Sequence, residues 1–193
     1  MQTDIVLAAG AELTFERMQN ANPVSAGLAA LAMLALALAG CGSERTADAA
    51  PAQKGPSDHF TINVGGHPAW LQLAVLAPEQ EHGLMQRPDL GKDEGMIFIY
   101  RSPQSQSYWM RNCPEPLDIA FATPDGAIAE IYPMYPFDER PVNSRSDQIQ
   151  FAVEMPQGWY AANGVRPGAS VDLKAVAEAL RARGFDPKDY KLP

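Results

Sequence analysis

Short stretches in which apolar and polar residues alternate recur along the chain after residue 59, and they predict β-strands. Residues 60–64 (FTINV) form one such stretch, and residues 70–76 (WLQLAVL) form the next. Gly65-Gly66 lies between them, so the two stretches predict a hairpin. Pro124-Asp125-Gly126 predicts a second hairpin turn. Further strands are expected at residues 96–100, 108–112, 117–122, 127–132 and 150–155, and a last strand is expected to begin or end at Val171.

Two stretches have a helical pattern instead. Residues 78–83 (PEQEHG) begin with a proline, continue with acidic residues and end in a glycine, which is typical of one or two helical turns. After Asp172, a favourable capping residue, apolar residues recur at helical spacing up to Leu180, and Gly184 ends the pattern. This second stretch predicts an amphipathic helix that covers an edge or a face of the sheet.

These elements together predict an all-β fold: a small antiparallel β-sandwich or barrel-like domain with short helices and a C-terminal amphipathic helix. The 17 prolines and 15 glycines among 193 residues favour short elements separated by turns over a helical bundle. The length is that of a single domain once an N-terminal segment has been set aside.

That N-terminal segment contains about fifteen consecutive uncharged residues at positions 26–40. A transmembrane helix needs about 20 residues to cross the hydrocarbon core, so this stretch fits the apolar region of a signal peptide better. The sequence LAGC at residues 38–41 follows the pattern of a bacterial lipobox, in which Cys41 receives the lipid. We therefore expect a lipoprotein signal peptide at 1–41, a flexible linker at 42–58, a β domain at 59–172 and a C-terminal helix and tail at 173–193.

Lipidation at Cys41 predicts a protein anchored in the cell envelope and facing the periplasm or the exterior. Two or three acyl chains hold a protein firmly, because each buried CH₂ contributes ~0.8 kcal/mol. Gly42, rather than an aspartate, favours the outer membrane in a bacterium with two membranes. The membrane is thus the first expected partner of this chain.

The overall charge and the two cysteines exclude several classes of protein. A formal net charge of −8 and a pI near 4.8 argue against nucleic-acid binding, which needs a basic surface. If Cys41 carries lipid, then Cys113 has no disulfide partner in its own chain. Cys113 is therefore expected to be a buried, inert thiol.

Three pairs of sequence clusters resemble the DUF192 family, a group of small bacterial and archaeal proteins without an established activity. They are GLMQR at 83–87 with DEGMIF at 93–98, YWMRN at 108–112 with PLDI at 116–119, and VEMPQG at 153–158 with GVRPG at 164–168. The resemblance covers about residues 60–172 and implies an all-β, sandwich-like domain. The C-terminal helix lies outside it.

Polar residues within these clusters stand next to strongly apolar ones, which is typical of a small-ligand pocket. We expect a pocket floored by Trp109 that binds a small polar ligand or an envelope protein, without a cofactor. The candidate ligand-binding residues are Arg87, Glu94, Trp109, Arg111, Asn112, Asp118 and Glu154. The alternative is that Arg87 pairs with Glu94 or Asp118 and locks loops together.

Three other functions are compatible with the same residues. A carboxylate-dependent hydrolase would use Glu94 with Asp118 or Glu154. A copper protein would use the soft ligands Cys113, Met85, Met96, Met110, Met134 and Met155, although single methionines scattered through strands are more typical of core packing. A purely structural role would combine a sealed polar cluster with an exposed apolar patch. His59, His67 and His82 are expected to be solvated.

Overall fold

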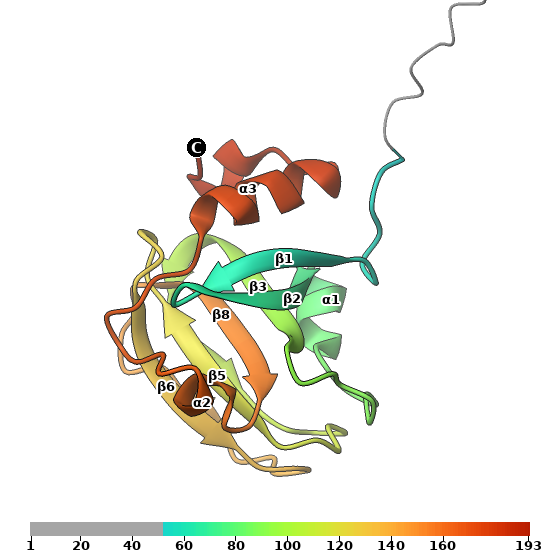
Figure 1. Cartoon of the computed structure of the whole chain (residues 1–193), viewed down its shortest axis with the longest axis vertical. Helices are drawn as coiled ribbons and strands as arrows, with labels where there is room; N and C mark the ends of the chain where they lie inside the picture. Colours follow the sequence, from blue (N-terminus) through green and yellow to red (C-terminus); the bar gives the residue numbers. More distant parts are fainter. Residues whose placement is uncertain (1–51) are drawn as a thin grey trace, which may run out of the picture. The chain divides into compact units, whose positions relative to one another are not determined.

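The computed structural model describes residues 52–193, and its centre is a six-stranded sheet in the order β1-β2-β3-β8-β5-β6 (Figure 1). The predicted signal peptide, Cys41 and most of the predicted linker lie outside the described residues. A separate two-stranded sheet pairs β4 with β7. The strands are β1 His59–Val64, β2 His67–Ala74, β3 Glu94–Gln104, β4 Ser107–Tyr108, β5 Leu117–Ala122, β6 Ile128–Met134, β7 Val142–Asn143 and β8 Ile149–Pro156.

The strand-rich fold with a few short helices is the expected class, with two differences in the sheet. The sheet is open rather than closed into a barrel. The pair β2–β3 is parallel, whereas all the other paired strands are antiparallel. Helix α1, Ala77–His82, lies between β2 and β3 in the chain and provides the crossover connection that a parallel pair requires.

The strand predicted at residues 108–112 is wrong for most of its length. Only Tyr108 belongs to a strand, and the chain turns at Arg111 and Asn112. Asn112 has a φ of 56°, a left-handed conformation that asparagine tolerates better than most residues. The predicted last strand at Val171 is reduced to a single bridge with Val64.

Hydrophobic cores lie on both faces of the sheet. On β3 and β8, Ile97, Phe151 and Val153 belong to one core, and Phe98 and Ala152 belong to the other. Successive side chains of a strand point to opposite faces, so both cores are built from the same strands. This arrangement explains why every residue of β8 from Ile149 to Met155 is buried.

Helix α3, Leu173–Ala182, covers the first of these cores beside β1 (Figure 1). Its predicted features are confirmed: Asp172 accepts a hydrogen bond from the Ala175 N–H at 3.0 Å, and Val176 and Leu180 are buried. The short helices α2, Trp159–Ala162, and η1, Pro187–Tyr190, were not predicted. None of the helices in residues 52–193 is long and apolar enough to cross a membrane.

The end of the predicted linker packs against the C-terminal part of the domain. The Lys54 N–H donates to the Ala182 carbonyl at 2.9 Å, and the Gln53 side chain donates to the Arg183 carbonyl at 3.0 Å. The buried Arg183 guanidinium in turn donates to the Leu73 carbonyl at 2.8 Å and pairs with Glu79 at 2.5 Å. These hydrogen bonds hold residues 53–54 against the end of α3, and the ion pair holds Arg183 against α1.

Candidate functional site

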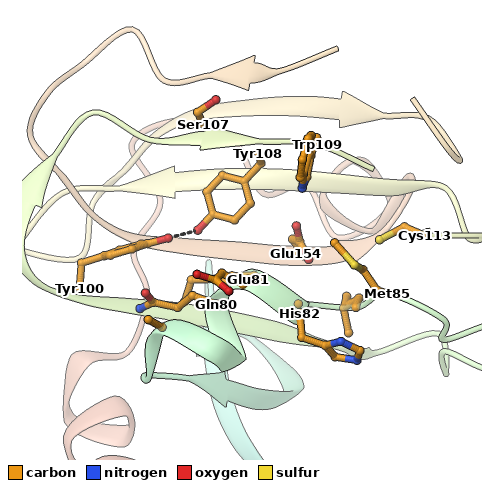
Figure 2. A pocket seen from close by; sticks show the side chains of 14 residues that line it. Gln80, Glu81, His82, Met85, Tyr100, Ser107, Tyr108, Trp109, Cys113 and Glu154 are labelled. Carbon is orange, nitrogen blue, oxygen red and sulfur yellow. Dashed lines mark hydrogen bonds between the residues drawn. The ribbon is translucent and has the colours of Figure 1, made fainter. Parts of the chain in front are cut away.

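A cavity of about 490 Å³ opens on the side of the sheet whose core contains Phe98 and Cys113. Side chains from four segments surround it (Figure 2). Helix α1 and the turn after it supply His82 and Met85, and β8 supplies Glu154. Strand β3, β4 and the loop after β4 supply Tyr100, Tyr108, Trp109 and Cys113.

Glu154 is the unusual residue of this cavity. It lies on the central strand β8, opposite Met96 of β3 and Ile119 of β5, and only 4% of its surface is exposed. Within residues 52–193 its carboxyl group makes no hydrogen bond and no ion pair, and burial raises its pKa to about 8. The other buried polar residue of β8, Gln150, donates its side-chain N–H to the Tyr190 carbonyl at 2.6 Å. Glu154 is thus a protonated, unpartnered acid at pH 7, facing an open space.

The groups beside Glu154 are neutral and mostly apolar. The hydroxyls of Tyr100 and Tyr108 are 2.7 Å apart and bond to each other, as Figure 2 shows. Burial, helped by the carboxylate of Glu154, raises the pKa of the Cys113 thiol to about 12. The prediction that Cys113 is buried is confirmed, and its raised pKa disfavours the reactive thiolate.

Trp109 stands at the edge of the cavity, where 46% of its surface is exposed. The guanidinium of Arg111 lies over its ring, 5.5 Å from the centroid. The Trp109 ring thus makes a cation–π contact with Arg111. Figure 2 shows the Trp109 side chain directed toward the part of the cavity where Glu154 lies.

Arg87 and Glu94 form a separate cluster, in the locked arrangement considered from the sequence. Arg87 Nη2 donates to Glu94 Oε1 at 2.6 Å, and His59 Nε2 lies 2.9 Å from the same oxygen. Burial by itself would raise the pKa of Glu94, but the hydrogen bond from Arg87 and a backbone N–H outweigh it and lower the pKa. His59 is therefore not solvated as expected, since it also packs 4.4 Å from the Trp70 ring. Arg87 lines a second hollow, of about 480 Å³, together with Gln72.

Asp118 and Asn112 have local roles in the backbone. The Asp118 carboxylate accepts a hydrogen bond from the Gly158 N–H at 2.8 Å, and burial raises its pKa. The Asn112 carbonyl accepts the Gln86 N–H at 2.8 Å and so fixes the turn.

Of the seven candidate ligand-binding residues, only Trp109 and Glu154 line the same cavity. The other five, Arg87, Glu94, Arg111, Asn112 and Asp118, do not line this cavity. His82, Tyr100 and Tyr108 also line the cavity and were not predicted, although His82 and Tyr108 lie within or beside the sequence clusters at 83–87 and 108–112.

The residues named for the hydrolase and copper alternatives have other contacts in the structure. Glu94, the common member of the expected hydrolytic pairs, is held by Arg87 and His59. Among residues 52–193, no three His, Cys, Asp or Glu side chains are grouped so that they could hold a metal. Met155 packs in one core, whereas Met96, Met110 and Met134 pack in the other. These four methionines therefore fill core space.

The profile of DUF192, a family described as an uncharacterized ACR, matches residues 60–173, which is more than half of the chain. The chain belongs to the DUF192 family. No curated protein matches this DUF192 chain.

Two solved structures are similar to it. A Novosphingobium aromaticivorans protein of unknown function is 35% identical, with 64% of this chain and 93% of that chain covered and a TM-score of 0.58. A Sinorhizobium meliloti protein described as a "putative transcription regulator" is 29% identical, with 58% and 92% covered and a TM-score of 0.56. Both matches span nearly the whole of the other protein, so the fold is that of a small, self-contained domain.

Proposed function

We propose that this DUF192 protein is an envelope lipoprotein that binds a small polar ligand in the cavity at Glu154. The observation that carries the proposal is the Glu154 carboxyl group, which is buried without a partner and faces that cavity. The walls of the cavity are largely apolar and aromatic, with a few polar groups pointing inward, as is typical of small-molecule sites.

Burying the Glu154 carboxyl group without a partner costs free energy, which supports a role in ligand binding rather than in core packing. A buried polar group without a hydrogen bond costs about 1–3 kcal/mol. Gln150 on the same strand donates its side-chain N–H to the Tyr190 carbonyl, although its Oε1 accepts no hydrogen bond, and it does not line the cavity. Bound ligand would supply the partner that the protein itself withholds from Glu154.

The lipobox at residues 38–41 supports the location. A short uncharged run that ends in LAGC directs lipid to Cys41, and two or three acyl chains hold the protein at the membrane. The chain after Cys41 would then carry the cavity into the periplasm or the exterior.

Thermal-shift screening of the full chain in detergent against small polar metabolites tests the binding role. Compounds that stabilise the parent by several degrees are then titrated against Glu154→Gln and Trp109→Ala. We expect affinity to fall at least tenfold in both variants, because Glu154→Gln replaces the carboxyl group that meets the ligand and Trp109→Ala removes an aromatic side chain that lines the cavity. Glu139→Gln, at an exposed carboxylate, is the matched control and retains parental affinity. Hits that bind both cavity variants as tightly as the parent would refute the site, and so would a screen without hits.

A further inference from the structure

We infer that the ligand is a small amine, bound as an ammonium ion that pairs with the carboxylate of Glu154. This inference rests on the proposed binding function and specifies the chemical class of the ligand. Three properties of the cavity support it: the charges of its lining residues, its apolar walls and the protonation of Glu154.

The charges of the cavity favour a cation. Among the described residues that line it are two carboxylic acids, Glu154 and Glu81, and neither a lysine nor an arginine. The nearby Arg87 is paired with Glu94 and Asp89, and Arg111 is not among the residues that line the cavity. An anionic ligand would meet two acids and no lysine or arginine among the lining residues, whereas an ammonium ion would meet an unpaired carboxyl group.

The walls suit the rest of such a molecule. Leu84, Met85 and Phe98 offer apolar surface to a short carbon chain or ring. The aromatic ring of Trp109 can contact the cation itself, as it already does with Arg111. Glu81 is exposed at the cavity, so a second amino group at the far end of a diamine would also find a carboxylate.

The protonation state of Glu154 predicts how the affinity for an amine changes with pH. In the empty cavity burial raises its pKa to about 8, so the carboxyl group is protonated at pH 7. Pairing with an ammonium ion requires the carboxylate, so binding below pH 8 releases one proton from Glu154 to the solvent. Affinity for an amine therefore rises with pH, approaching tenfold per pH unit up to about pH 8. A neutral ligand that accepts a hydrogen bond from the protonated acid would show no rise, and then a fall above pH 8.

Other titratable groups face the same cavity and need to be separated from Glu154. Burial raises the pKa of Tyr100, Tyr108 and Cys113, so these groups stay neutral between pH 6 and pH 8. Burial also raises the pKa of Tyr160, which packs on the other face of the sheet, so Tyr160 stays neutral as well. Glu81 and His82 on α1 also line the cavity. A pH dependence that disappears in Glu154→Gln, with Glu81 and His82 unchanged, is therefore assigned to Glu154.

The test uses three probes of similar size, n-butylamine, 1-butanol and butyrate, titrated into the full chain in detergent and followed by NMR chemical shifts. We expect n-butylamine to bind at least tenfold more tightly than either of the others at pH 8, and to lose affinity below pH 8 by a factor that approaches tenfold per pH unit. Glu154→Gln removes both the preference and the slope, whereas Glu139→Gln keeps both.

Two results overturn the inference. One is equal or tighter binding of 1-butanol or butyrate, and the other is an amine affinity that does not change between pH 6 and pH 8. If metabolites from the screen still need Glu154 and Trp109, only the amine class fails and the binding role stands. If neither the probes nor the metabolites bind, the proposed function fails as well.

Discussion

At the scale of single residues, Glu154 also links the stability of the domain to pH. Its pKa is about 8 in the folded protein and near 4.5 in an unfolded chain. Between these values the folded state keeps a proton that the unfolded state has lost, so stability falls as pH rises. The slope approaches about 1.4 kcal/mol per pH unit. We expect urea unfolding at pH 5, 6.5 and 8 to show this fall in the parent and a much flatter profile in Glu154→Gln.

Glu139→Gln is the control for this measurement, since an exposed carboxylate contributes little to the profile. Equal slopes in the parent and in Glu154→Gln would show that Glu154 ionises freely in the folded protein. The carboxyl group would then be hydrated rather than desolvated.

Residue types alone could not separate the candidate site residues. Arg87, Glu94 and Glu154 look equivalent in the sequence, because a pocket and a salt bridge use the same side chains. What distinguishes them is that Glu94 at the start of β3 meets Arg87 and His59, whereas Glu154 near the end of β8 meets no counterion among the described residues. Such long-range partners depend on the strand order, which no local pattern encodes.

At the scale of elements, β3 and β8 approach each other closely beside Glu154, and Gly95 makes this approach possible. A Cβ atom on Gly95 would collide with the backbone oxygen of Glu154 and with the Met155 sulfur. We expect Gly95→Ala to destabilise the domain by about 1–3 kcal/mol, because the two central strands must separate to admit one methyl group. Chemical denaturation measures this change.

Gly55→Ala is the matched control for Gly95→Ala. An added Cβ there meets its nearest atom at 3.9 Å, so the change should stay within about 0.5 kcal/mol. If Gly95→Ala were as stable as Gly55→Ala, the contact between β3 and β8 would have to be looser than described.

The elements predicted best from the sequence are those whose signal is local. Alternation in residues 60–64 and helical spacing after Asp172 are properties of a few adjacent residues, and both elements are found. Residues 108–112 have strand-like composition, but the left-handed Asn112 and its bond to Gln86 override it. The parallel pairing of β2 with β3 was missed because it depends on the path of the chain through α1.

At the scale of the whole molecule, the lipid anchor is tested by the two cysteines, each of which serves as a control for the other. We expect Cys41→Ser to abolish incorporation of radiolabelled palmitate by cells that express the full chain, because the acceptor thiol is gone. Cys113→Ala should keep the label, since Cys113 is buried in the domain. Label that persists in Cys41→Ser, or that disappears in Cys113→Ala, would contradict the lipobox assignment.

The place of β8 in the sheet has a consequence for the order of events during synthesis. β8 lies between β3 and β5, yet it is the last of the sheet's six strands to leave the ribosome. Until residue 156 has emerged, β1–β3 and β5–β6 are two fragments with no common hydrogen bonds, and each presents a bare strand edge. Folding of the sheet must therefore wait for the chain to be nearly complete, and the half-made protein depends on its surroundings to keep those edges apart.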